Sequence, residues 1–256
     1  MSHDHRAAPT ERFSNRVGDY VRYRPGYPPQ VVALLRELTG LAPGWRVADL
    51  GSGTGISTAA LLEAGHEVFA VEPNKDMREA AESMLGSRPD FHSVDGTAEA
   101  TGLDPGSVDL VVAAQAFHWF DRDAARAEMA RVLRPDGWVA LIWNVRQTAS
   151  SEFLQELEAL LLDYSIDYAR IRHENVTDEV VRAFLTRDYG KRTFEHAQEF
   201  DLDGLRGRIS SASYVPAPGD PGHEPLFAEL AQLFERRAEN GRVRFVYDAV
   251  VHAGRL

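Results

Sequence analysis

The sequence predicts an α/β fold: a doubly wound, Rossmann-like sheet of seven mostly parallel strands, with an antiparallel C-terminal strand and helical cap insertions. Short apolar runs alternate with helix-like segments between Arg46 and Trp143, which is the pattern of right-handed βαβ units. A glycine-rich turn follows the first apolar run, as it does at the ligand-binding edge of such sheets. Beyond Trp143 this alternation ends, and Val243–His252 alternates polar and apolar residues, which is typical of an edge or antiparallel strand.

Five strands and three helices are expected in the first part of the chain. The strands are Arg46–Leu50, Glu67–Val71, Arg88–Val94, Val108–Ala114 and Trp138–Trp143. The helices are Ser57–Glu63, a segment capped by Asn74 that ends near Leu85, and Asp121–Leu133.

Local residue chemistry supports these boundaries. Val108–Ala114 is apolar enough for a strand that is buried on both faces. Asn74 and Asp121 precede their helices, where a side-chain oxygen accepts a hydrogen bond from the first turn. A turn is expected at Arg134–Gly137, because it contains Pro-Asp-Gly. The helix after Asn74 is expected to expose Arg78, Glu79 and Glu82.

The second part of the chain adds two strands and helical insertions. The strands are expected at Arg192–Phe200 and Val243–His252, and the helices at Glu152–Asp163 and Pro225–Asn240, with a loop at Tyr214–Gly222. We therefore divide a single domain into three segments. Residues 1–44 form an N-terminal lid and helix, 45–144 form a cofactor-binding core, and 145–256 form the insertions and the last two strands.

Composition limits the functional classes. The 256 residues, 44% of them hydrophobic, suffice for one sizeable core. A net charge of −11 disfavours nucleic acid as a partner. The absence of cysteine excludes disulfides, zinc–thiolate sites and thiol nucleophiles, and the histidines lack metal-ligand spacing, so no metal is expected. No apolar run is long enough for a membrane span or a secretory signal, so we expect a cytoplasmic protein with no membrane partner. A monomer or homodimer is expected.

The turn VADLGSGTGIS raises the question of which ligand contacts its bare backbone. Gly51 and Gly53 permit positive φ and close approach of a ligand. The spacing G-x-G-x-G differs from the dinucleotide pattern G-x-G-x-x-G, and no lysine follows it as in a P-loop. Glu72 ends the second strand, 23 residues after Asp49, where an acid accepts hydrogen bonds from both ribose hydroxyls and repels a 2′-phosphate.

Five segments in order resemble the class I S-adenosylmethionine-dependent methyltransferases. They are VADLGSGTGIS, VEPNKDM, GTAEATG, DLVVAAQAFHWFD and ARVLRPDGWVALIWN, which together span roughly Trp45 to Asn144. The segments YVRYRPGYP and HWF are similar to the small-molecule branch that includes trans-aconitate methyltransferase-like enzymes.

The resemblance implies a set of cofactor-binding residues. Asp49, Gly51 and Gly53 would line the methionine part of S-adenosylmethionine, and Glu72 would hold its ribose. The adenine would lie near Pro73, Met77, Thr97 and Ala98. Many members carry an acid at the position of Thr97, so here the exocyclic amine would bond to a backbone group or to Asp95. Gln115 would lie beside the methionine moiety and the methyl acceptor.

The acceptor side is less strongly specified. His118 is the candidate catalytic base just past the fourth strand; alternatively, it orders this loop or caps the next helix. Trp119 either lines the substrate pocket or packs within the protein without contacting substrate. Tyr20 or Tyr23 of an N-terminal lid would face the sulfonium.

Two further segments have alternative interpretations. Arg22 or Arg24 would pair with an anionic substrate, unless this segment is a helix packed at the domain edge with solvated arginines. The segment Ser210–Tyr214 either lines the pocket from the cap or is a capped turn.

The sequence thus predicts in-line methyl transfer from S-adenosylmethionine to a small-molecule acceptor, with a carboxylate or hydroxyl as the candidate group. One alternative is a non-catalytic S-adenosylmethionine-binding sensor or assembly module, because a fold and a cofactor site do not fix function. The other is an NAD-dependent oxidoreductase, against which the glycine spacing counts.

Overall fold

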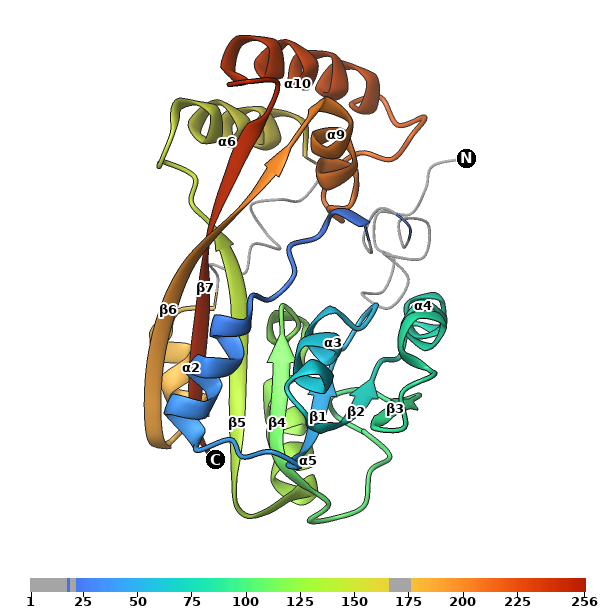
Figure 1. Ribbon diagram of the computed structural model, residues 1–256, viewed down its shortest axis with the longest axis vertical. Helices are drawn as coiled ribbons and strands as arrows, with labels where there is room; N and C mark the ends of the chain where they lie inside the picture. The colour runs from blue at the N-terminus through green and yellow to red at the C-terminus, as the bar shows by residue number, and fades with distance from the viewer. Residues whose placement is uncertain (1–17, 19–21, 166–175) are drawn as a thin grey trace.

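The computed structural model describes residue 18 and residues 22–165 and 176–256. Within these ranges, a seven-stranded sheet is flanked by helices and surmounted by a helical cap (Figure 1). The strands are β1 Arg46–Leu50, β2 Glu67–Val71, β3 Phe91–Val94, β4 Val108–Ala114, β5 Leu133–Arg146, β6 Arg187–Phe200 and β7 Val243–Arg255. The helices are α2 Pro29–Thr39, α3 Ile56–Glu63, α4 Lys75–Leu85, the 3₁₀ turn η2 Phe117–Trp119, α5 Arg122–Val132, α6 Glu152–Tyr164, α8 Asp178–Phe184, α9 Leu202–Ser210 and α10 His223–Arg237.

The strand order is β3-β2-β1-β4-β5-β7-β6. Strands β1 to β5 pair in parallel, whereas β7 is antiparallel to both β5 and β6. The predicted fold class, including its antiparallel C-terminal strand, is therefore confirmed. Because β1 lies between β2 and β4, the strand order reverses there, and ligands of open α/β sheets bind beyond the carboxyl ends of the strands at such a point.

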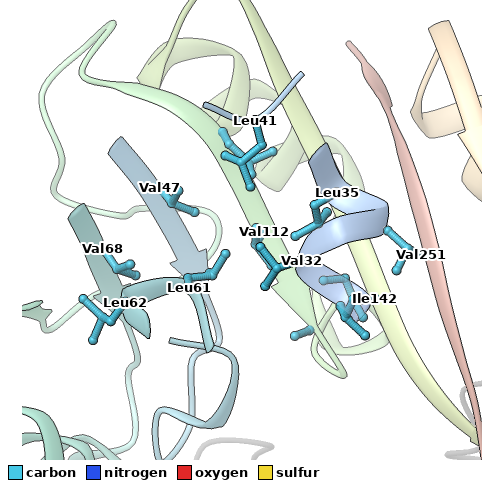
Figure 2. Close-up of a cluster of buried hydrophobic side chains, with 14 of the residues drawn as sticks. Val32, Leu35, Leu41, Val47, Leu61, Leu62, Val68, Val112, Ile142 and Val251 are labelled. Atoms are coloured by element: carbon cyan, nitrogen blue, oxygen red, sulfur yellow. The ribbon is translucent and has the colours of Figure 1, made fainter. Parts of the chain in front are cut away.

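Hydrophobic layers cover both faces of the sheet. On one face, Val32 and Leu35 of α2 and Leu61 of α3 pack over the central strands, as Figure 2 shows. On the other face, Met129 of α5 and Phe184 of α8 belong to a second cluster with the same strands. A sheet covered in this way explains why β4 is apolar and buried at every position except Asp109, with both of its faces withdrawn from water.

The cap has a core of its own. It is formed by α6, α9 and α10 together with the distal ends of β6 and β7, with Leu157, Leu205 and Leu230 fully buried. Figure 1 shows these three helices beyond the carboxyl ends of β4 and β5, and β6 and β7 rising from the sheet to meet them. The cap therefore lies over the edge of the sheet where a ligand is expected.

Several boundaries differ from the sequence prediction for local reasons. The third strand begins at Phe91 instead of Arg88, because the Arg88 guanidinium pairs with the Asp90 carboxylate and the Phe91 N–H donates to the Arg88 carbonyl in a turn. The fifth strand is longer than expected at both ends, because Leu133 pairs with Val108 of β4 and the residues after Trp143 pair with β7. The sixth strand begins earlier than expected, because β7 pairs with it from Arg187.

The turn expected at Arg134–Gly137 lies within the bounds of β5, and Asp136 there has a turn-like φ of +63°. Helices α8 and α9 were not predicted. Their short sequences are rich in charged residues and glycine, so neither shows an apolar period long enough to identify a helix.

Candidate cofactor and acceptor site

The glycine turn joins the carboxyl end of β1 to α3 in a conformation that favours glycine. Gly51, Gly53 and Gly55 have φ values of +67°, +57° and +86°, as expected for the first two. A Cβ on Gly51 would lie 2.7 Å from the Ala116 Cβ, and one on Gly55 would lie 2.8 Å from a Leu85 methyl carbon. Both conformation and space therefore require glycine, and the turn keeps its backbone accessible beside β4.

Asp49 is a buried carboxylate at the base of this turn. Its Oδ2 accepts hydrogen bonds from the Ser57 and Thr58 hydroxyls, both at 2.7 Å. Burial raises the pKa of Asp49, and these two hydrogen bonds oppose the rise. Its Oδ1 is also buried and accepts no hydrogen bond from the described residues. Asp49 therefore retains an acceptor that suits a cationic group.

Glu72 links the end of β2 to the glycine turn. Its Oε2 accepts from the Gly53 N–H at 2.9 Å, and its Oε1 accepts from the Asn74 N–H at 2.8 Å. Burial raises its pKa, the two backbone hydrogen bonds and Arg78 lower it, and nearby Asp49 raises it slightly. Each carboxylate oxygen can accept more than one hydrogen bond, so both remain able to accept from hydroxyls.

Arg78 corrects the sequence prediction, which placed it on the solvent side of its helix. Its side chain is only 15% exposed, because it lies under the loops that follow β2 and β3. One guanidinium nitrogen donates to the Glu72 and Pro73 carbonyls at 2.8 and 3.3 Å, and the other pairs with Asp95 at 3.0 Å. Arg78 thus joins the two loops between which an adenine is expected.

The other predicted adenine residues lie around the same loops. Asn74 caps α4 by accepting from the Met77 N–H at 3.0 Å, which orders the buried Met77 beside the glycine turn. A Cβ on Gly53 would lie 3.6 Å from the Met77 sulfur. Thr97 and the buried Ala98 form a tight turn closed by hydrogen bonds between the Thr97 and Ala100 backbones.

Gln115 occupies the carboxyl end of β4 with an unusual backbone. Its φ of +58° lies in the left-handed region, which costs a residue with a Cβ about 1–3 kcal/mol, and residues strained in this way cluster at functional sites. Its N–H donates to the Ile142 carbonyl at 2.8 Å, and its side-chain Nε2 donates to the Asn144 carbonyl at 3.2 Å. The ends of β4 and β5 are therefore tied together.

His118 and Trp119 follow on η2, where both are half-buried and their rings lie 4.8 Å apart. The turn is anchored by the fully buried Phe117, which packs against Phe184 and Trp143. The structure therefore places His118 just beyond the carboxyl end of β4. Its catalytic role and the contact of Trp119 with substrate stay predictions.

The described part of the N-terminal segment contacts the cap. The Tyr23 ring packs on Gly207 of α9, where a Cβ would overlap it. An Arg24 guanidinium nitrogen donates to the Ser211 carbonyl at 2.8 Å, and Arg22 stacks over the Tyr23 ring at 5.2 Å. The predicted Tyr20 lies outside the described residues. The segment Ser210–Tyr214 ends α9, and Ser211 and Ala212 are buried.

The sequence analysis missed three polar residues of this region, Asn144, His196 and Arg208. The Asn144 Oδ1 lies 2.9 Å from His196 Nε2, and Arg208 Nε donates to the Tyr247 hydroxyl at 3.1 Å. Asn144 directly follows a predicted strand at its carboxyl end, so its position could have identified it. His196 and Arg208 belong to no local motif and reach the site only through the tertiary fold.

No three histidine, aspartate or glutamate side chains in the described ranges are grouped so as to hold a metal ion. None of the helices in these ranges combines the length and apolar character of a membrane span.

Sequence comparisons match residues 48–141 to the methyltransferase domain family. An uncharacterized methyltransferase of Mycobacterium tuberculosis (strain H37Rv) is 45% identical over 134 residues, which are 52% of each chain, so the match spans about half the length of that relative. An uncharacterized methyltransferase of Schizosaccharomyces pombe is 28% identical over 236 residues, covering 89% of this chain and 90% of the relative.

Solved structures resemble this fold over most of the chain. One from Anaeromyxobacter dehalogenans, described as a type II methyltransferase, has a TM-score of 0.63 and 25% identity, covering 91% of this chain and 98% of its own. A phosphoethanolamine N-methyltransferase 2 of Haemonchus contortus, in complex with phosphomonomethylethanolamine and S-adenosylhomocysteine, has a TM-score of 0.51 and 17% identity. The match covers 93% of this chain and 57% of that structure's chain. Residues 48–141 thus match the methyltransferase domain family in sequence, and the fold of the described chain is that of the class I S-adenosylmethionine-dependent methyltransferases.

Proposed function

We propose that this protein transfers a methyl group from S-adenosylmethionine to a small-molecule acceptor that carries a carboxylate or hydroxyl group. The observation that carries the proposal is the pair of buried carboxylates, Asp49 and Glu72, on either side of a left-handed glycine turn at the point where strand order reverses. The proposal places the protein in the cytoplasm as a monomer or homodimer.

The residues at this edge fit such a cofactor. The buried Oδ1 of Asp49, which has no partner among the described residues, suits the ammonium group of the methionine part. The Glu72 carboxylate suits the two ribose hydroxyls, and its hydrogen bond from Gly53 holds it at the glycine turn. Since burial raises the pKa of both acids, a cationic ligand beside them would stabilise their charged forms.

The proposed chemistry asks little of the protein beyond alignment. The bound cofactor would supply a sulfonium methyl group that is activated for in-line displacement. The chain would hold the acceptor near the end of β4 and exclude water with the cap and the N-terminal segment. A carboxylate acceptor needs no base, whereas a hydroxyl must lose its proton, and His118 is the side chain proposed to accept it.

Calorimetric titration tests the proposed cofactor. S-Adenosylmethionine and S-adenosylhomocysteine should bind to the purified protein, and NAD should not. Glu72→Ala should weaken binding at least about tenfold, because it removes a buried carboxylate that accepts charge-assisted hydrogen bonds. Glu79→Ala is the matched control, because Glu79 lies on α4 with its side chain 59% exposed. NAD binding, or full affinity in Glu72→Ala, would contradict the proposal.

A further inference from the structure

The carboxyl end of β5 carries a buried amide with an unused donor. Asn144 is only 6% exposed, and its Oδ1 accepts a hydrogen bond from His196 Nε2 at 2.9 Å. Its Nδ2 is also buried, but donates to none of the described residues. An unsatisfied buried donor costs about 1–3 kcal/mol, so its presence at a ligand-binding edge indicates a ligand that satisfies it.

Asn144 lies directly beside the predicted cofactor residue on the next strand. Its carbonyl accepts from the Gln115 side chain at 3.2 Å, and Gln115 has the left-handed backbone already described. Both residues stand at the carboxyl ends of neighbouring parallel strands, where ligands of this fold bind. The unused Nδ2–H therefore lies on the acceptor side of the proposed cofactor site.

His196 fixes the orientation of this amide from the far side of β7. Its ring stacks on Tyr247, with centroids 5.4 Å apart and planes 24° from parallel. Burial lowers the pKa of His196 and nearby Asp248 raises it, so the ring is neutral at pH 7. A neutral imidazole has one N–H, and this N–H on Nε2 donates to the Asn144 oxygen. The amide nitrogen is thereby turned away from His196.

The surroundings favour an anionic partner for the amide. The Tyr247 hydroxyl accepts a hydrogen bond from Arg208, which is 8% exposed as a residue and also donates to the Ser211 hydroxyl. Arg24 reaches the Ser211 carbonyl from the N-terminal segment. Two guanidinium groups thus flank this polar network on the cap side, whereas the Asp248 carboxylate lies near His196. The positive charges on the cap side favour a carboxylate over a cationic acceptor there.

We propose that the Asn144 amide donates a hydrogen bond to a carboxylate oxygen of the methyl acceptor, and that His196 is the positioning residue that holds this amide. The inference deepens the proposed function and rests on it. It identifies a small carboxylic acid as the acceptor class and assigns the selection to β5 and β6, outside the residues that would bind the cofactor.

The test combines cofactor binding with turnover. Wild type, Asn144→Asp, His196→Ala and His196→Gln are assayed with a panel of small mono-, di- and tricarboxylic acids, by release of S-adenosylhomocysteine. Asn144→Asp keeps the shape and the oxygen that faces His196 but replaces the donor with a negative charge. Thr193→Ala on the exposed part of β6 is the matched control.

We expect S-adenosylhomocysteine affinity within about twofold of wild type in every variant. KM for the acid should rise at least about tenfold in Asn144→Asp, because a charged hydrogen bond is lost, and kcat should change less. His196→Ala should raise KM, and His196→Gln should restore it, because the Gln amide nitrogen can replace Nε2. The acid should also shift the side-chain amide resonance of Asn144 in the cofactor-bound protein.

Failure of the inference and failure of the proposed function give different results. An unchanged KM in Asn144→Asp with normal cofactor affinity would overturn the inference alone. The same holds if no acid in the panel is methylated or shifts the Asn144 resonance while the cofactor binds. A wild-type protein that binds neither S-adenosylmethionine nor S-adenosylhomocysteine would overturn the proposed function, and the inference with it.

Discussion

His252 should make the stability of the protein depend on pH below neutrality. It lies on β7 with 4% of its surface exposed, and its Nδ1 is 2.8 Å from the Tyr189 hydroxyl. Burial lowers the pKa of His252 to about 4, with further lowering by Lys191 and Arg182 and an opposing effect of Asp178. The imidazole is therefore neutral in the folded protein at pH 7.

The sign follows from which state binds the proton more tightly. The unfolded chain protonates His252 with a pKa near 6.5, whereas the folded protein does so only near 4. The stability contribution is therefore present above pH 6.5 and is lost as the pH falls toward 4. Between pH 7.5 and pH 5, these two pKa values correspond to a loss of about 2 kcal/mol in the free energy of unfolding.

Urea unfolding at pH 7.5 and pH 5 measures this loss, with His252→Asn as the comparison. Asn keeps a polar atom near the position of Nδ1 and does not titrate. The variant should be less stable at pH 7.5, because the smaller side chain leaves space, but its pH-dependent loss should be smaller by about 2 kcal/mol. Equal pH dependence in the two proteins would refute the assignment of this titration to His252.

Three further substitutions test the site and the cap. Gly51→Ala should destabilise the fold by about 2–5 kcal/mol in urea unfolding, because a residue with a Cβ is strained at the φ of +67° and its Cβ would lie 2.7 Å from the Ala116 Cβ. Wild-type stability of this variant would contradict the expectation. Gly207→Ala should displace the Tyr23 ring and accelerate trypsin cleavage of the bond before Tyr23, and an unchanged cleavage rate would show that the contact is not needed. Arg78→Met should weaken S-adenosylhomocysteine binding about tenfold in calorimetry while the fold is kept, and undiminished affinity would show that the two loops hold their positions without it.

Features set by neighbouring residues in the sequence were predictable. The glycine turn, the Asn74 cap and the boundaries of β1, β2 and β4 follow from short-range sterics and apolar patterning, and the structure confirms them. Arg78 was placed on the solvent side because helical periodicity does not reveal that loops after β2 and β3 fold over that position. The error shows that a charged residue near a helix start can be buried by segments beyond its own helix.

The polar network beyond the cofactor residues could not be predicted for a different reason. His196 faces Asn144 only because β7 inserts antiparallel between β5 and β6, which sets residues 52 apart in sequence within hydrogen-bond distance. The charged residues of β6 give no sequence pattern that distinguishes His196 from its exposed neighbours. Such contacts depend on strand order and register, which a single sequence does not fix.

The long β6 and β7 strands connect the carboxyl ends of β4 and β5 to the cap. Gln115 contacts Asn144, Asn144 contacts His196, His196 stacks on Tyr247, and Tyr247 binds Arg208 of α9. Every step of this series is a direct contact between neighbouring side chains or backbone groups. A shorter β6–β7 pair would support the same cofactor turn but would leave α9 without this connection to the strand ends. The strands that complete the sheet therefore also position the cap. For this reason, the proposal assigns acceptor selection to the C-terminal half of the chain. The glycine turn and Glu72, which would bind the cofactor, lie in the N-terminal half.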